Sequence, residues 1–107
     1  MIPHQLHNGS KILTITLSED LISTTVEKHR QELFDLLDNP SADWEVLELD
    51  LTGVRRMDSV GLNLIVGMLN QVRTRNAKMR ALVHEGNVRQ AFLFTRLDRQ
   101  IEVLVKS

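Results

Sequence analysis

A serine that could accept a phosphate stands where an apolar segment of the chain gives way to a helical pattern. Residues 49–62 read LDLTGVRRMDSVGL, and Asp58 and Ser59 come just before the apolar residues begin to repeat at helical spacing. Either side chain can accept hydrogen bonds from the unpaired amides in the first turn of a helix. Spacing alone therefore leaves two interpretations open, an ordinary helix cap and a functional hydroxyl.

A phosphate on Ser59 would be locally tolerated and outwardly effective. It would lie against free amides at the positive end of the helix dipole, so the fold should survive the modification. It would also add about −1.5 to −2 charge units beside Asp58 on a surface loop, where a partner presenting carboxylates would be repelled. The residues thus predict a reversible binding switch at Ser59.

The helix that follows Ser59 has a wide apolar surface. At about 100° per residue, its apolar residues form one face and a neighbouring stripe; the face holds Leu62, Ile65, Val66, Leu69 and Val72, and the stripe holds Val60, Leu64 and Met68. Together they span roughly two-thirds of the circumference, which is more than a one-sided helix needs. Either internal packing or a partner must cover the stripe, and packing is the commoner outcome.

The bulk composition favours one soluble domain with protein partners. Of 107 residues, 42% are hydrophobic, and the formal net charge of −1 offers no field for nucleic acid or an anionic membrane. The absence of cysteine removes disulfides and thiolate metal sites, and it fits a reducing compartment. Neither a signal peptide nor a run of about 18 apolar residues is present, so we expect a cytoplasmic protein.

The apolar patterns predict the element order β-β-α-β-α-β-α-β. Strands are expected at 2–7, 11–17, 46–51, 79–83 and 101–105, and helices at 24–38, 60–75 and 87–95. Asn8-Gly9 suits a tight hairpin, Thr24 with Glu27 suits a capping box, and Asn87 with Gln90 marks the start of the third helix. This alternation predicts a single α/β domain over residues 1–107. Its sheet should be mostly parallel with an N-terminal antiparallel hairpin, and its helices should pack mainly on one face.

The segment from Leu49 to Leu62 resembles the signature of the anti-sigma factor antagonists, bacterial members of the STAS domain family, in which an apolar strand leads into Asp-Ser-Ser-Gly-Leu at a helix start. The likeness extends over nearly the whole chain. It implies that Ser59 is phosphorylated by an anti-sigma factor that is itself a serine protein kinase. The unphosphorylated form would bind that kinase and free a sigma factor, and a serine phosphatase would reverse the modification.

The resemblance also implies a non-enzymatic protein without cofactors and places the loop at 18–23 beside the phosphoacceptor loop in the partner interface. Contacts to the partner are expected from Ser18, Asp20, Asp58, Val60, Gly61, Asn63, Leu64 and Met68. Two departures from the family pattern are Val60 in place of a second serine, and Thr95-Arg96-Leu97 where many members have Ser-Gly-Leu. STAS domains also occur in transporters and lipid-trafficking machinery, so a subunit of such a complex is the alternative function.

The enzymatic interpretations lack necessary parts. Asp58-Ser59-Val60-Gly61 is not the Gly-x-Ser-x-Gly motif of hydrolases, and no histidine is clearly placed as its base. His29 falls on an apolar helix face, as packed boundary residues do. The remaining histidines, His4, His7 and His84, make a poor metal set without cysteine or an acidic cluster.

Two further alternatives concern charged residues. Asp50 ends a strand, as the phosphoacceptor of a response-regulator receiver does, and Glu19-Asp20 could imitate the receiver's acidic pair, yet no lysine follows Val83. Four basic residues gather near the end of the second helix, namely Arg73, Arg75, Lys78 and Arg80. Cations complement a helix carboxyl end, which favours a solvated terminus over a nucleic-acid patch.

Overall fold

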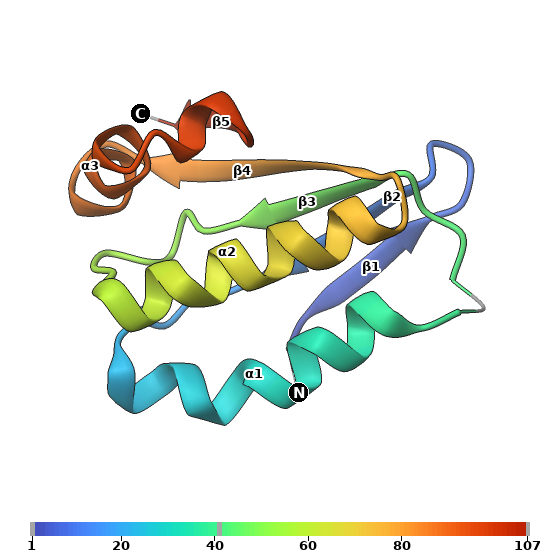
Figure 1. The fold of residues 1–107 in the computed structure, drawn as a ribbon, viewed down its shortest axis with the longest axis horizontal. Helices are drawn as coiled ribbons and strands as arrows, with labels where there is room; N and C mark the ends of the chain where they lie inside the picture. Colours follow the sequence, from blue (N-terminus) through green and yellow to red (C-terminus); the bar gives the residue numbers. More distant parts are fainter. Residues whose placement is uncertain (1, 41, 107) are drawn as a thin grey trace.

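The structure, a computed structural model, describes residues 2–40 and 42–106 and has the predicted order of elements (Figure 1). The strands are β1 (His4–His7), β2 (Ile12–Thr16), β3 (Val46–Asp50), β4 (Lys78–His84) and β5 (Glu102–Lys106). The helices are α1 (Ser23–Asp38), α2 (Ser59–Thr74) and α3 (Asn87–Phe94), with a 3₁₀ turn, η1, at Leu97–Arg99. The α/β class predicted from the sequence is confirmed.

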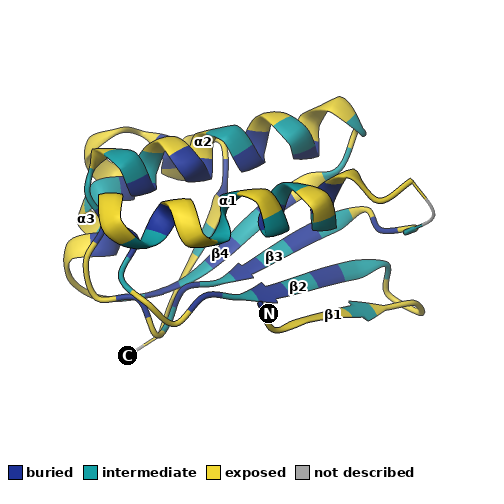
Figure 2. Cartoon of the chain, turned by 90° about the horizontal axis from the view of Figure 1, so that it is seen from below, coloured by how far each residue is buried: buried dark blue, intermediate teal, exposed yellow. Residues whose placement is uncertain are grey.

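The five strands form one sheet in the order β1-β2-β3-β4-β5. The β1–β2 pair is antiparallel, and the other three pairs are parallel. Helices α1 and α2 lie side by side over one face of this sheet, whereas α3 lies beyond the carboxyl end of β4 (Figures 1 and 2). The predicted parallel sheet with an N-terminal hairpin is therefore also confirmed.

The core lies between the sheet and the α1–α2 layer. Alternate residues of the central strands face this layer and are fully buried, as the period of two in a strand requires; they include Ile15, Leu47, Leu49, Ala81 and Val83. The residues between them point to the opposite face and are only partly buried. None of the helices in the described ranges is long and apolar enough to cross a membrane.

The apolar stripe on α2 belongs to the core, which corrects the expectation that Leu64 and Met68 contact a partner. Both side chains are fully buried. Because α2 packs against α1 as well as the sheet, its buried arc is wider than that of a helix with one neighbour (Figure 2). Val66, which the helical spacing predicts to face the sheet, is instead 36% exposed.

Two local features differ from the predicted ones. The hairpin loop spans residues 8–11, and Lys11 rather than Asn8 or Gly9 has positive φ, at 56°. Helix α1 begins at Ser23, and the hydroxyl of Thr25 accepts a hydrogen bond from the Ile22 amide. The expected capping box at Thr24 is therefore wrong, since the hydroxyl that accepts a hydrogen bond at this helix start belongs to Thr25.

Candidate functional site

The carboxylate of Asp58 joins the beginnings of two helices. Its Oδ1 accepts hydrogen bonds from the amides of Val60 at 2.9 Å and Gly61 at 3.0 Å, in the first turn of α2. Its Oδ2 accepts from the amide of Ser23 at 2.9 Å, the first residue of α1. The sequence predicted the cap on α2, but the second cap depends on a contact across 35 residues of chain.

Asp20 holds the loop that leads to Ser59. Its Oδ1 accepts from the backbone amides of Arg55 at 3.0 Å and Arg56 at 3.1 Å, and its Oδ2 lies 3.5 Å from Nε of Arg56. These amides, followed by the Arg56 side chain, lower the pKa of Asp20 below its ordinary value. The loop after β2 is thus fastened to the loop that leads to Ser59, and both oxygens of Asp20 face groups within the chain.

Close backbone approach also joins the two loops. Leu21 and Met57 form an isolated parallel bridge, in which the Leu21 amide donates to Arg56 and the Asp58 amide donates to Leu21. A Cβ placed on Gly61 would lie only 2.1 Å from the carbonyl oxygen of Leu21. Only glycine fits at position 61, which makes Gly61 a buried packing residue rather than a surface contact.

A third segment supports the loop from the other side. The side-chain oxygen of Asn87, at the start of α3, accepts from the Met57 amide at 2.8 Å. Helix α3 begins at Asn87, as predicted, and the residue before it is Gly86, with φ of 130°. Met57 itself is buried, so the loop is anchored at its base while its outer residues remain at the surface.

Ser59 is the first residue of α2 and is exposed. Its hydroxyl makes no hydrogen bond with any part of the described chain, so it is open to an approaching enzyme. The expectation of free amides beneath it is only partly right, because Asp58 already occupies those of Val60 and Gly61. A phosphate on Ser59 would therefore lie beside an occupied carboxylate rather than in an empty anion site.

The pKa of Asp58 predicts a pH dependence of stability. The Gly61 amide, assisted by those of Ser23 and Val60, lowers this pKa below the ordinary value of 3.8. A carboxyl group with a depressed pKa in the folded state stabilises the fold above its unfolded pKa, and this contribution is lost as the pH falls through the folded value.

We expect Asp58→Asn to be less stable than wild type at neutral pH and to lose less stability on acidification. Urea unfolding at neutral pH and near pH 3 measures both terms. Asp43→Asn, which alters an exposed carboxylate in the loop before β3, is the control and should follow the wild-type curve. Parallel curves for Asp58→Asn and wild type would contradict the assigned role of the cap.

The structure sorts the expected contact residues into two groups. Ser18, Ser59 and Asn63 are exposed, and Asp20, Asp58 and Val60 are partly so. The main chain of Ser18 comes within 3.1 Å of a Cβ built on Gly53, which places it directly beside the loop. The other group is Gly61, Leu64 and Met68, which are buried and have no surface to offer.

The described part of the chain does not supply the side-chain contacts that a hydrolase, a receiver or a metal site would need. Nε2 of His29 lies 3.5 Å from Glu19, and no histidine of the described chain bonds to Ser59. The Asp50 carboxylate accepts from the amide and hydroxyl of Thr52, which accounts for a polar residue at the end of β3. No group of three or more histidine or acidic residues in the described ranges could hold a metal ion.

The basic residues near the end of α2 do not form a common patch. The Arg75 guanidinium stacks on Trp44 at 3.8 Å and donates to the carbonyls of Leu37 and Ala42. Arg80 pairs with Glu48 at 2.7 Å. Since these cations serve different local partners, the expected solvated helix end describes them better than a nucleic-acid surface.

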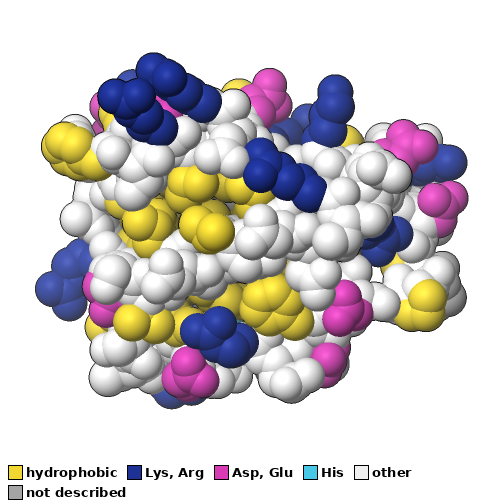
Figure 3. Space-filling view, in the orientation of Figure 1, with side chains coloured by type: hydrophobic (Ala, Val, Ile, Leu, Met, Phe, Trp, Pro, Cys, Tyr) yellow, Lys and Arg dark blue, Asp and Glu magenta, His cyan; other side chains and the backbone are white. Residues whose placement is uncertain are grey.

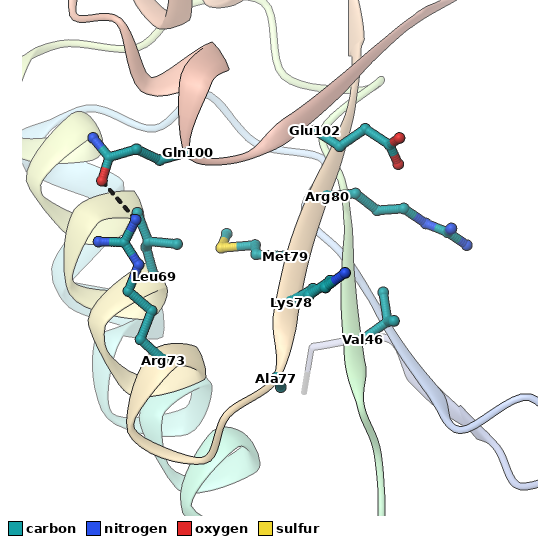
Figure 4. A pocket seen from close by; sticks show the side chains of 9 residues that line it. All are labelled: Val46, Leu69, Arg73, Ala77, Lys78, Met79, Arg80, Gln100 and Glu102. Carbon is teal, nitrogen blue, oxygen red and sulfur yellow. Dashed lines mark hydrogen bonds between the residues drawn. The ribbon is translucent and has the colours of Figure 1, made fainter.

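One pocket lies at the opposite end of the sheet from Ser59. It has a volume of about 500 Å³ and opens beside the start of β4, where Lys78 and Met79 precede the first residues paired with β5. Figure 4 shows that Arg73 turns to Gln100 while Arg80 points away from it, so these cations do not converge on one point. The pocket is therefore a weaker candidate for the functional site than the loop that leads to Ser59.

Comparisons with known proteins agree with this architecture. A family model described as the STAS domain matches residues 5–106. A search of curated proteins found no match. A crystal structure from Thermotoga maritima, of a protein assigned as an anti-sigma factor antagonist, is 18% identical with a TM-score of 0.83, covering 99% of this chain and 86% of that one.

Two structures of SpoIIAA are also similar. The unphosphorylated form, an anti-sigma factor antagonist, is 17% identical with a TM-score of 0.75, and the match covers 100% of this chain and 89% of that one. The phosphorylated form of the Bacillus protein is 16% identical with a TM-score of 0.65, with coverage of 100% and 92%. At these identities the likeness is one of fold. Since the family model spans nearly the whole chain, the chain belongs to the STAS domain family.

Proposed function

We propose that this protein is an anti-sigma factor antagonist that binds a serine-kinase anti-sigma factor while Ser59 is unphosphorylated and thereby releases a sigma factor. It acts in the cytoplasm, performs no catalysis of its own, and is reset by a serine phosphatase. The observation that carries the proposal is an exposed, unbonded serine hydroxyl at the start of a helix whose surroundings are fastened on three sides.

This fastening supports a switch that acts at the surface. Main-chain amides of the loop donate to the side-chain oxygens of Asp20 and Asn87, and Gly61 packs against the backbone of the loop after β2. These contacts do not include the Ser59 side chain. A phosphate on Ser59 can therefore change the surface charge without requiring the loop to unfold. Because the new dianion lies beside the Asp58 carboxylate, the local surface becomes strongly negative, and an acidic partner surface is repelled.

The partner surface that we propose on α2 differs from the stripe of Val60, Leu64 and Met68, because Leu64 and Met68 are buried. Residues at helical spacing below the acceptor, Asn63, Val66 and Asn70, are exposed along the same face as Ser59. Figure 3 shows apolar side chains along the hollow between α2 and the β4 side of the molecule. Together with Ser18, this stripe gives the proposed partner a polar rim and an apolar contact next to the phosphoacceptor.

The test compares two substitutions at the acceptor. We expect Ser59→Ala to bind a candidate serine-kinase anti-sigma factor as wild type does, and Ser59→Asp to bind at least about tenfold more weakly, or about 1.4 kcal/mol. Isothermal titration calorimetry measures both affinities. Equal affinities for the two variants would contradict the proposed switch, since charge at position 59 would then not affect binding.

A second measurement locates the phosphate and has a control within the chain. Ser23 is also exposed, also opens a helix, and also lies against Asp58. After incubation with the kinase and ATP, mass spectrometry should find phosphate on Ser59 and not on Ser23, and Ser23→Ala should be modified as wild type is. A hydroxylamine-labile phosphate would instead indicate an acyl phosphate, as on Asp50.

A further inference from the structure

The strand β5 (Glu102–Lys106) is an edge of the sheet that is left open. It pairs with β4 on one side, and no other described strand pairs with it on the other. Its five residues, Glu-Val-Leu-Val-Lys, contain no proline and no charge in the middle. Such features, or a bulge, are what ordinarily protect an edge strand from pairing with another chain.

Exposed apolar side chains concentrate around this edge. Of the large hydrophobic residues that are most exposed, all but Val66 lie between positions 93 and 105, namely Leu93, Phe94, Leu104 and Val105. Leu93, Val103 and Val105 also line one hollow of about 220 Å³ between α3 and β5. The strand therefore offers apolar surface as well as unpaired backbone groups.

The two ends of β5 carry opposite charges that are not satisfied within the chain. The carboxylate of Glu102 and the ammonium of Lys106 have no ion-pair or hydrogen-bond partner in the described ranges, even though Glu102 lies next to Arg80 in the β4–β5 register. Arg80 is bound instead to Glu48. Both charges are exposed and available to a group across the open edge.

We propose that two copies of this chain pair through β5 in antiparallel orientation, about a two-fold axis at Leu104. In this register Glu102 of each copy lies opposite Lys106 of the other, and Val103 lies opposite Val105. Leu104 then meets its own counterpart. The strand is thus complementary to itself in charge and in apolar character, as an isologous contact requires.

The geometry of the sheet is compatible with this pairing. A two-fold axis perpendicular to the sheet joins two five-stranded sheets into one and keeps the helices of both copies on the same side. Val103 and Val105 share the helix-covered face with Ala81 and Val83, while Leu104 shares the other face with Leu82. The hollow beside Leu93 would then flank the seam from both copies.

The other edge does not have these properties. Strand β1 (His4–His7) is shorter, has the sequence His-Gln-Leu-His, and follows Pro3. Proline at the start of an edge strand, together with polar side chains along it, is a common protection against pairing. Its antiparallel self-pairing would also bring no opposite charges together, so β5 is the edge that a second copy fits.

Charge exchange tests the register directly. Glu102→Lys would place two lysines opposite each other at both ends of the seam, and Lys106→Glu would place two glutamates there. We expect each variant alone to dimerise at least about tenfold more weakly than wild type in sedimentation-equilibrium ultracentrifugation. Mixing the two variants should restore association, because Lys at position 102 then faces Glu at position 106, and the remaining native pair is intact.

The mixture separates this register from simple misfolding, because two variants that were merely misfolded would not associate when mixed. The single variants separate it from parallel pairing, because a parallel pair would already place like charges opposite each other at positions 102 and 106 in wild type, and neither variant alone would then dimerise more weakly than wild type. Asp35→Lys, on the exposed side of α1, is the charge control and should dimerise as wild type does. A wild-type protein that remains monomeric at near-millimolar concentration, or a mixture that fails to associate, would overturn the proposal.

Discussion

A Gly61→Ala variant is expected to lose about 3 kcal/mol or more of the free energy of unfolding, because one added methyl group has nowhere to go. Its Cβ would lie 2.1 Å from the carbonyl oxygen and 2.8 Å from the carbonyl carbon of Leu21. Both are backbone atoms, and the Leu21 backbone is itself bonded to Arg56 and Asp58. Relief of the clash therefore requires the two loops to separate, which urea unfolding would register as a lower midpoint.

Gly67→Ala is the matched control, since it makes the same change within the same helix. There the added Cβ would meet the end of the Phe34 ring at 3.1 Å, and a side chain of this kind can shift. Alanine also favours a helix interior over glycine by about 1 kcal/mol. We expect Gly67→Ala to retain wild-type stability or to exceed it. If both variants were equally stable, the close approach at Gly61 would be refuted.

Met68→Lys is expected to destabilise the fold by about 4 kcal/mol or to prevent folding. The Met68 side chain is fully buried, so a lysine there must place its ammonium in an apolar core or push apart the layers around it. Circular dichroism during urea or thermal unfolding measures the loss. Lysine can reach towards the surface from shallow positions, but the Met68 side chain is fully buried within the hydrophobic core.

Val66→Lys provides the comparison on the same helix. Val66 is 36% exposed, so its replacement should change the free energy of unfolding by less than about 1 kcal/mol. Because Val66 belongs to the proposed partner surface, this variant should still weaken kinase binding. A stable Met68→Lys protein together with an unfolded Val66→Lys protein would contradict the assignment of Met68 to the buried face of α2 and of Val66 to its exposed face.

The order of elements could be predicted because it depends on local patterns. The alternation in β3 and β4, the helical spacing after Ser59 and the breaks at Asn39-Pro40 are all visible within short windows of sequence. The cap on α2 by Asp58 could be predicted for the same reason, since it spans only three residues. Such features involve no contact between distant parts of the chain.

The burial of Leu64 and Met68 could not be settled by the same means. A helical pattern shows that a residue is apolar and which face it shares, but not whether the neighbour on that face is a second helix or a partner. Here the neighbour is α1, which reaches α2 only through the folded chain. The contact of Asn87 with Met57 has the same character, because 30 residues separate its two ends.

Two glycines did carry a signal about the site that spacing alone did not reveal. Gly53 and Gly61 each stand where a Cβ would press on the loop after β2, at 3.1 Å and 2.1 Å respectively. Glycine within a helix is unfavourable by about 1 kcal/mol, so Gly61 in the first turn of α2 indicates a close approach by another segment. Which segment approaches it was not readable from the sequence.

The double use of the Asp58 carboxylate makes two helix entrances depend on one side chain. One oxygen belongs to the helix that begins with Ser59, and the other belongs to the helix that begins with Ser23. Removal of this one side chain would therefore leave amides at both helix entrances without their acceptor. A protein bound at the start of α1 would therefore lie beside the carboxylate that immediately precedes Ser59, although Ser23 and Ser59 are 36 positions apart in the chain.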